Sequence, residues 1–254
     1  MALATVNIVS KVLHRPMPVT LLLPDSGRPE GVLFLLHGFS DCHATIVQSS
    51  ALVRYCSGTP LLVIMPEAGC SFYADSPAGQ YWQYLTRELP QALENWFLLP
   101  QEKSCRFVGG ISMGGYGATK WALQFPEKFA AAFLLAPVTD LAGICEHGFD
   151  QSVDPNAPSL EDLHLDELFP GKVEGTREDL YFLLNQADPK TLPESFLYTG
   201  TEDFLFQDIC RFSQALKEKG GASRLICQSG IHDWPTWEEF LKDMICEISC
   251  RVKA

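Results

Sequence analysis

The residues best suited to chemistry surround Ser112, in the segment Gly110–Gly114. This G-x-S-x-G pattern follows an apolar stretch, Arg106–Gly109, and precedes a segment with helical periodicity. A serine in a sharp turn from strand to helix needs neighbours without side chains, and Gly110 and Gly114 meet that need. The start of the helix also favours negative charge beside the hydroxyl. The pattern predicts a nucleophilic serine; a glycine-rich turn with a surface serine is the alternative.

A serine hydroxyl needs a base before it can attack a carbon atom. After a strand–serine–helix pattern of this kind, an acid and then a histidine follow in the chain. Of six histidines, His147, His164 and His232 follow Ser112. The first two lie in a polar stretch, whereas His232 lies between the last apolar stretch and the last helical one. We therefore expect His232 to be the general base rather than a structural histidine.

The acid should lie in the loop before that histidine. Asp203 follows the apolar stretch Phe196–Gly200, at the position where it could accept the histidine Nδ1–H and stabilise the imidazolium. Glu202 and Asp208 are rivals for the role, and Asp188 is a weaker one. We expect Asp203.

Acyl transfer also needs donors for the developing oxyanion. The backbone N–H of Met113, directly after the serine, is one candidate. The second is the N–H of Phe39, in the loop that follows the apolar stretch Gly31–Leu36. His37, in the same loop, is expected to shape the loop by hydrogen bonding.

Apolar and helical segments alternate along the chain, which predicts a doubly wound, mostly parallel α/β sheet with helices on both faces. The expected strands are Ala2–Lys11, Pro18–Leu23, Gly31–Leu36, Pro60–Met65, Arg106–Gly109, Ala131–Leu135, Phe196–Thr199 and Arg224–Cys227. The expected helices are Ala44–Tyr55, Tyr81–Phe97 with a bend at Pro90, Met113–Gln124, Asp179–Ala187, Phe206–Lys219 and Trp237–Cys250. The segment at about 144–175 is expected to be a short insertion over the active-site edge, within a single domain of residues 1–254.

The composition limits the partners. The chain has 254 residues, 46% of them apolar, and a net charge of −12. Such an acidic chain is expected to avoid nucleic acid and anionic membrane surfaces. The odd count of nine cysteines and the absence of a secretory pattern near the N-terminus favour reduced thiols in the cytoplasm. A metal site of Cys246, Cys250 and His232 is conceivable, but we expect none.

Several motifs resemble the esterase D or putative esterase group of α/β-hydrolases, and within it the bacterial tributyrin esterases. The resemblance covers nearly the whole chain. The matching stretches are Leu35–Asp41, Val63–Gly79, Tyr84–Phe97, Gly109–Leu123, Tyr198–Asp208 and Gly230–Leu241. It implies the α/β-hydrolase fold, with the family's triad on Ser112, Asp203 and His232 and its oxyanion donors on Phe39 and Met113.

The expected pocket is partly aromatic. The segment Cys70–Asp75 resembles a loop that borders the pocket in this family. Phe204 flanks the acid, and Trp234 and Trp237 flank the base. Core packing is the alternative for each aromatic residue. The residues expected to bind substrate are Phe72, Tyr73, Asp75, Phe204 and Trp234.

These features predict a serine carboxylesterase that hydrolyses short-chain acyl esters, including acetyl groups on sugars, through an acyl-enzyme. A thioesterase resembling S-formylglutathione hydrolase, or an acyltransferase, could use the same triad, and a silent binding module is a third interpretation. We expect a small-molecule ester substrate and no cofactor. A homo-oligomer is also compatible with the sequence.

Overall fold

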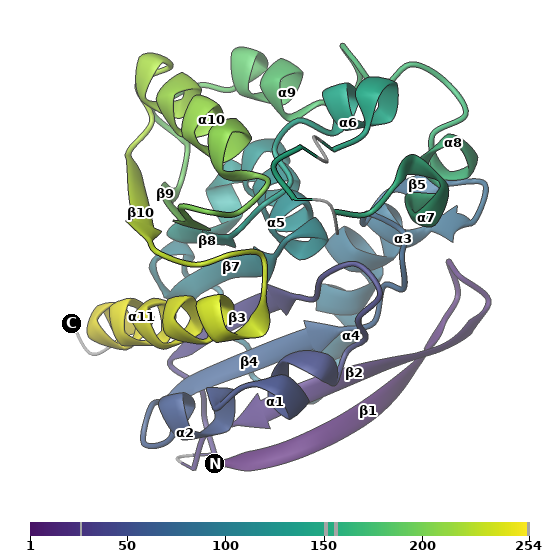
Figure 1. The fold of residues 1–254 in the computed structure, drawn as a ribbon. Coiled ribbons are helices and arrows are strands. Elements are labelled where there is room, and N and C mark those ends of the chain that lie inside the picture. Colours follow the sequence, from purple (N-terminus) through teal and green to yellow (C-terminus); the bar gives the residue numbers. More distant parts are fainter. Residues whose placement is uncertain (26, 150–151, 155–156, 253–254) are drawn as a thin grey trace.

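An eight-stranded sheet forms the centre of the molecule in this computed structural model, which describes residues 1–25, 27–149, 152–154 and 157–252 (Figure 1). Across the sheet the strands lie in the order β1-β2-β4-β3-β7-β8-β9-β10. Their bounds are β1 Ala2–Ser10, β2 Arg15–Leu23, β3 Gly31–Leu36, β4 Leu61–Pro66, β7 Arg106–Ile111, β8 Ala131–Leu135, β9 Glu194–Gly200 and β10 Ser223–Gln228.

The sheet is mostly parallel, as predicted. From β4 to β10 every neighbouring pair is parallel, whereas β1 and β2 form an antiparallel hairpin and β2 pairs antiparallel with β4. The carboxyl ends of the parallel strands therefore meet at one edge, where loops from distant parts of the chain come together.

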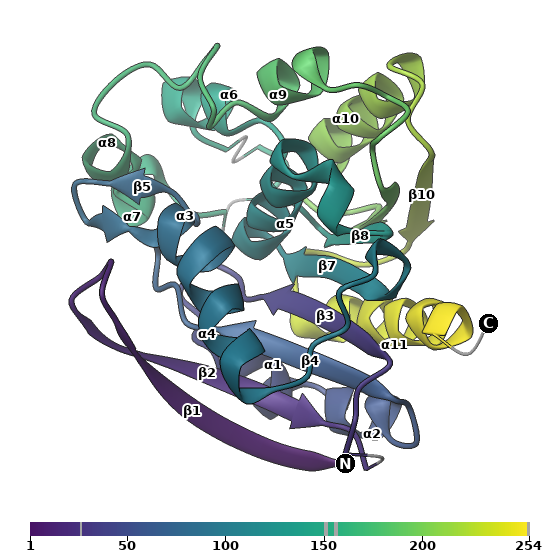
Figure 2. The same ribbon diagram turned by 180° about the vertical axis from the view of Figure 1, so that it is seen from behind.

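Both faces of the sheet are buried, which explains the unbroken apolar runs. In β3 the side chains of Val32 and Phe34 belong to one core, and that of Leu33 belongs to the core on the opposite face. Helices α5 and α10 cover the first face, and α11 covers the second with α2 (Figures 1 and 2). The longer helices are α4 Leu89–Trp96, α5 Met113–Gln124, α9 Leu180–Gln186, α10 Phe206–Glu218 and α11 Trp234–Val252.

Two predicted helices differ in the structure. The expected helix Ala44–Tyr55 is two short ones, α1 Thr45–Ser49 and α2 Leu52–Cys56, because the chain is extended at Ser50. The expected helix Tyr81–Phe97 is divided into α3 Tyr81–Gln83, the π-helical turn Tyr84–Glu88 and α4. Pro90 lies in the first turn of α4 and has no backbone N–H to donate. The π-helical turn, which is wider than an α-helical one, comes directly before α4. The hairpin of β5 Asp75–Ser76 and β6 Gly79–Gln80 was not predicted.

The segment at about 144–175 contains short helices, as expected of an insertion. These are α6 Leu141–His147, α7 Leu160–Leu163 and α8 Leu165–Leu168. They lie beyond the carboxyl edge of the sheet (Figure 1). Within the described residues, no helix is both long and apolar enough to cross a membrane. That residues 1–254 form a single domain stays a prediction.

Candidate active site

Ser112 occupies the sharp turn between β7 and α5. Its backbone is in a strained conformation, with φ 55° and ψ −116°. A Cβ atom at Gly114 would lie 2.1 Å from the carbonyl oxygen of Leu36, and one at Gly110 would lie 2.3 Å from the backbone of Gly114. The two glycines are therefore required by the close packing of β3, β7 and α5 around the serine.

The structure brings together the three side chains predicted to act with one another. His232 Nε2 lies 2.9 Å from Ser112 Oγ, and His232 Nδ1 lies 2.8 Å from Asp203 Oδ2. Asp203 is fully buried, and its other oxygen accepts a hydrogen bond from the backbone N–H of Leu205 at 2.8 Å. A buried carboxylate held in this way fixes the histidine so that Nε2 faces the hydroxyl.

The rival acids are engaged elsewhere. Glu202 accepts a hydrogen bond from the backbone N–H of Gly230 at 2.6 Å. Asp208 pairs with Arg211, and Asp188 accepts a hydrogen bond within its own turn. Among the described residues, Asp203 alone places a carboxylate on the imidazole of His232.

Aromatic rings hold the imidazole from two sides. The ring of Phe204 lies 4.7 Å from that of His232, and Trp237 meets it edge-on at 4.9 Å. Trp234 packs against Trp237 at 5.3 Å. These contacts limit rotation of the imidazole and exclude water from part of its surface.

The two backbone N–H groups predicted to bind an oxyanion lie beside Ser112. Met113 is the first residue of α5, so its N–H has no acceptor within the helix. The loop with Phe39 approaches closely: a Cβ atom at Gly38 would lie 3.8 Å from Ser112 Cβ. In the described ranges, neither the N–H of Phe39 nor that of Met113 has a hydrogen-bond acceptor. Both donors remain available to a ligand.

His37 and Tyr73 shape the loop with Phe39. The Nδ1 of His37 lies 2.8 Å from the carbonyl oxygen of Gly38, and its Nε2 accepts a hydrogen bond from the backbone N–H of Ala68 at 3.1 Å. Burial lowers the pKa of His37, which favours the neutral ring that this pattern needs. The hydroxyl of Tyr73 donates to the carbonyl of His37 at 3.0 Å.

A cavity of about 560 Å³ opens beside Ser112 and His232. Of the residues expected to bind substrate, Phe72, Phe204 and Trp234 line it. Tyr73 is not among the described lining residues, since it is buried beneath the loop. Asp75 also lies away from the cavity, where it accepts a hydrogen bond from the backbone N–H of Gln83 and pairs with Arg177.

The prediction missed other parts of the wall. Phe149, Pro158 and Leu163 come from the insertion, and the ring of Phe149 lies 4.8 Å from that of Phe204. No local pattern in the polar segment marked these positions. The insertion therefore supplies part of the cavity wall.

Three aspartates, Asp41, Asp154 and Asp233, line the same cavity, and the described lining contains no lysine or arginine. Burial raises the pKa of Asp41, although the nearby His37 opposes this. The wall thus combines aromatic rings with hydrogen-bond acceptors of negative charge, so it favours neutral or cationic ligands.

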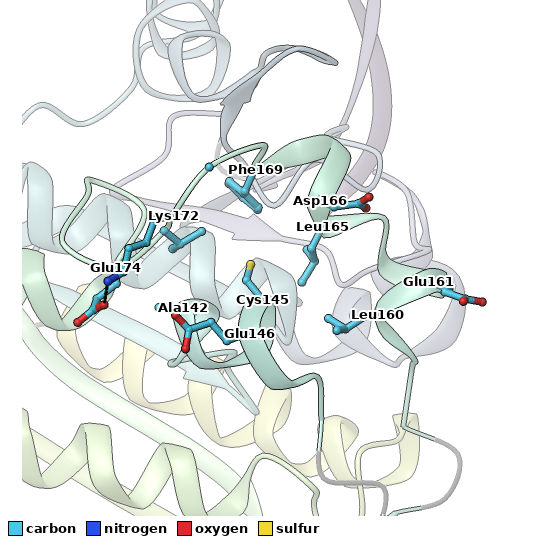
Figure 3. A pocket seen from close by; sticks show the side chains of 12 residues that line it. Ala142, Cys145, Glu146, Leu160, Glu161, Leu165, Asp166, Phe169, Lys172 and Glu174 are labelled. Atoms are coloured by element: carbon cyan, nitrogen blue, oxygen red, sulfur yellow. Dashed lines mark ion pairs between the residues drawn. The ribbon is translucent and has the colours of Figure 1, made fainter.

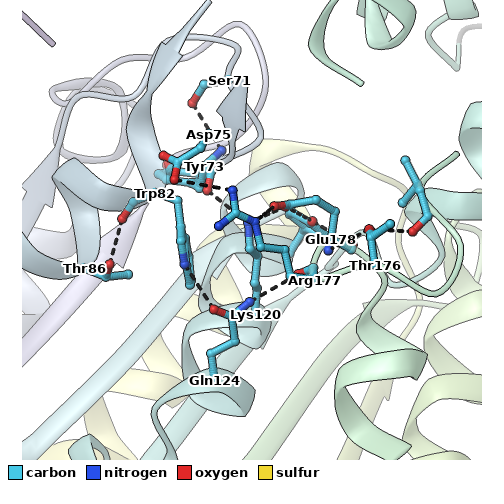
Figure 4. Close-up of polar contacts among 12 residues, drawn as sticks. Ser71, Tyr73, Asp75, Trp82, Thr86, Lys120, Gln124, Thr176, Arg177 and Glu178 are labelled. Atoms are coloured by element: carbon cyan, nitrogen blue, oxygen red, sulfur yellow. Dashed lines mark hydrogen bonds and ion pairs between the residues drawn. The ribbon is translucent and has the colours of Figure 1, made fainter. Parts of the chain in front are cut away.

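Lys120, on the helix that begins after Ser112, is fully buried and pairs with Glu178 (Figure 4). The hydroxyl of Tyr116 donates to a carboxylate oxygen of Glu178 at 3.0 Å, and Lys120 Nζ donates to the carbonyl of Tyr73 at 3.4 Å. Burial lowers the pKa of Lys120 to about 8, against the opposing effect of Glu178. The pair connects α5 to the chain that leaves the insertion.

A second cavity, of about 400 Å³, lies within the insertion (Figure 3). Cys145, Leu165 and Phe169 form part of its wall, while Lys172 pairs with Glu174 at its edge. No residue of the triad lines it. The conceivable metal site of Cys246, Cys250 and His232 is not formed, because both ring nitrogens of His232 are engaged with Asp203 and Ser112.

Comparison with known proteins gives a consistent result. Residues 10–248 match the family model described as "Putative esterase". An acetyl esterase of Caldicellulosiruptor saccharolyticus is 26% identical, over 95% of this chain and 96% of that protein. Two solved structures from Staphylococcus aureus are each 27% identical and cover 98% of both chains: the fluorophosphonate-binding serine hydrolase FphF, with a TM-score of 0.85, and the S-formylglutathione hydrolase FrmB, with 0.83.

The family match covers most of the chain, and the structural likeness covers nearly all of it. The predicted family and the predicted α/β-hydrolase fold are confirmed. The likeness to tributyrin esterases in particular stays a prediction. The chain belongs to the putative esterase family and is a serine esterase that acts on small-molecule esters.

Proposed function

We propose that Ser112, His232 and Asp203 are the catalytic triad of a short-chain carboxylesterase. The observation that carries the proposal is the continuous hydrogen-bond chain from Ser112 Oγ to the buried Asp203 carboxylate. As Ser112 attacks the ester carbonyl, His232 takes the hydroxyl proton and then gives it to the leaving alcohol. Water, activated by the same histidine, then releases the acid from the acyl-enzyme.

The N–H groups of Phe39 and Met113 would stabilise the negative oxygen of each tetrahedral intermediate. Their support is their position beside Ser112 without other acceptors in the described ranges. Loss of one such donor typically raises the barrier by about 2.7–4 kcal/mol. Phe39→Pro would remove one of these N–H groups, and a side chain at Gly38, whose Cβ atom would lie 3.1 Å from Asp41 Oδ2, would displace the loop that carries it.

The cavity favours an ester whose alcohol is neutral and rich in hydroxyl groups. Asp41, Asp154 and Asp233 offer acceptors for hydroxyls, while Phe72, Phe204 and Trp234 offer apolar faces. Glutathione carries a net negative charge, and the described lining holds no lysine or arginine to receive it. This argues for acetylated polyols or sugars over a glutathione thioester. The relative named acetyl esterase supports the same choice.

For the cellular setting we propose the cytoplasm, with no nucleic-acid or membrane partner. The nine cysteines are all free thiols, and the net charge of −12 opposes binding to phosphate-rich surfaces. Size-exclusion chromatography with light scattering would determine whether the chain is a monomer or a homo-oligomer.

A substrate panel tests the proposal. Purified protein is assayed with p-nitrophenyl acetate, butyrate and octanoate, with acetylated sugars, and with S-formylglutathione, alongside Ser112→Ala. We expect the highest kcat/KM on short neutral esters and an acyl adduct on Ser112 in rapid-quench mass spectrometry. A higher kcat/KM on S-formylglutathione, or turnover that survives Ser112→Ala, would contradict it.

A further inference from the structure

Three side chains with metal-binding atoms meet near the loop that carries Phe39. One ligand atom from each of Cys42, His43 and Glu67 lies within 4.8 Å of the other two. Cys42 and His43 precede α1, and Glu67 follows β4 (Figure 1). All three are half-buried, so an ion could reach them from solvent, and none belongs to the described lining of the active-site cavity.

Each of these side chains is oriented by a further contact. The hydroxyl of Thr45 donates to Cys42 Sγ at 3.4 Å, and His43 Nδ1 lies 2.7 Å from Thr20 Oγ1. The Glu67 carboxylate accepts hydrogen bonds from three backbone N–H groups, one of them that of His43. Within the described part of the chain, His43 Nε2 has no hydrogen-bond partner. Ligands held by outer contacts of this kind are characteristic of metal sites.

The donor set selects the metal. A thiolate, an imidazole and a carboxylate are the ligands that proteins use for Zn²⁺, whereas Mg²⁺ and Ca²⁺ prefer oxygen alone. We propose that Cys42, His43 and Glu67 form a Zn²⁺ site, with a water molecule as the fourth ligand. Bonds of about 2.0–2.3 Å place tetrahedral ligands about 3.3–3.8 Å apart, so the side chains would close by at most about 1.5 Å around the ion.

Binding at this site is an exchange of a proton for the metal. The Cys42 S–H bond breaks, a Zn–S bond forms, and the proton passes to solvent, with no change in the oxidation state of either atom. We therefore expect about one proton to be released for each Zn²⁺ bound, so affinity rises with pH.

The first test is calorimetric titration of the full chain with ZnCl₂ after treatment with a chelator. We expect one Zn²⁺ per chain, and affinity at least about tenfold weaker in Cys42→Ser and in His43→Gln. The control is Cys227→Ser, an exposed cysteine on β10 that should bind Zn²⁺ as the wild type does. A wild type that binds no stoichiometric Zn²⁺, or a Cys42→Ser variant with unchanged affinity, would overturn the site.

The second test uses Co²⁺ as a spectroscopic probe and stays valid if a variant loses stability. A cobalt–thiolate bond gives a charge-transfer absorption band that reports the sulfur ligand directly. The band should be present in wild type and Cys227→Ser and missing in Cys42→Ser. The i, i+4 thiols Cys246 and Cys250 on α11 are the other thiols to test. A band lost only when these two are replaced would assign the metal to α11 and refute the proposal. Neither readout depends on esterase turnover.

Discussion

The two sides of the active-site cavity are held in place differently. On the side of Ser112, backbone packs against backbone, and a single added carbon at Gly114 would lie 2.1 Å from a carbonyl oxygen. The facing side is made of side chains such as Phe149 and Leu163 from an insertion of helices four to seven residues long. We expect the first side to determine the reaction and the second to shape which esters fit.

The buried pair of Lys120 and Glu178 joins the two sides. Lys120 belongs to α5, the helix that Ser112 begins, and Glu178 lies between the insertion and α9 (Figure 4). Tyr73, held by the same lysine, also braces the loop of Phe39 through the carbonyl of His37. Changes to the triad should therefore affect turnover alone, whereas changes to the pair should affect stability.

The largest effect is expected from Ser112→Ala. Removal of the nucleophile should lower kcat by about 10⁶-fold on every ester in the panel, because no other group can form the acyl-enzyme. The melting temperature should stay close to that of the wild type, since Ser112 makes its backbone contacts without its hydroxyl. Steady-state kinetics and thermal denaturation measure both. An equal loss of kcat on all substrates would show that the side of the cavity with Ser112 determines the reaction and not the substrate selectivity.

Asp203→Asn should rank second, with kcat lower by about 10⁴-fold, because the amide favours the wrong tautomer of His232. Glu202→Gln is the matched control. The carboxylate of Glu202, next to Asp203 in the chain, accepts a hydrogen bond from the N–H of Gly230 and not from His232. The Glu202→Gln variant should therefore keep kcat within about threefold of the wild type. If Glu202→Gln lost activity and Asp203→Asn kept it, the acid would be misassigned.

The sequence was sufficient to predict the eight strands of the central sheet and the sharp turn at Ser112, while the roles of Asp203 and His232 as acid and base stay a prediction. The strands and the turn depend on apolar runs and on contacts close in the chain, such as Gly110 against Gly114. The wall at Phe149 and the partner of Lys120 were beyond prediction, because each depends on a contact between distant segments. Hydrophobic periodicity along the chain indicates that a residue is buried, but it does not identify the residues that this side chain contacts.

Lys120→Met should lower the free energy of unfolding by about 3–5 kcal/mol, since it leaves the buried Glu178 carboxylate with only the exposed Arg177, 3.4 Å away, as a cationic partner. Chemical denaturation measures this, with the exposed Lys242→Met as control, for which we expect less than about 1 kcal/mol. Adding Glu178→Gln to Lys120→Met should recover part of the loss. A double variant as unstable as the sum of the single ones would show that the two residues do not act as a pair.

The same pair predicts a smaller, pH-dependent effect. The pKa of Lys120 is lowered to about 8 in the folded protein, mainly by burial, and is about 10.4 in an unfolded chain. Between these values the unfolded state binds more protons, so the contribution of Lys120 to stability rises with pH. The stability advantage of wild type over Lys120→Met should therefore grow by about 1–3 kcal/mol from pH 8 to pH 10. The charged groups that act on Lys120 are Glu178, Asp75 and Arg177. If the stability advantage of the wild type shrank from pH 8 to pH 10, the pKa of Lys120 would not be lowered in the folded protein.

Phe149→Ala should have the smallest effect on turnover and the clearest one on selectivity. Its ring lines the cavity and packs on Phe204, so its loss enlarges the space for the ester without removing a member of the triad. We expect kcat/KM for the acetate ester to fall less than about tenfold, while the ratio for bulkier esters over acetate rises by about ten- to a hundredfold, as one or two extra methylenes find room. The panel of acyl lengths measures the ratio. A uniform loss across the panel would mean that the insertion also supports the reaction, and the division between the two sides of the cavity would no longer hold.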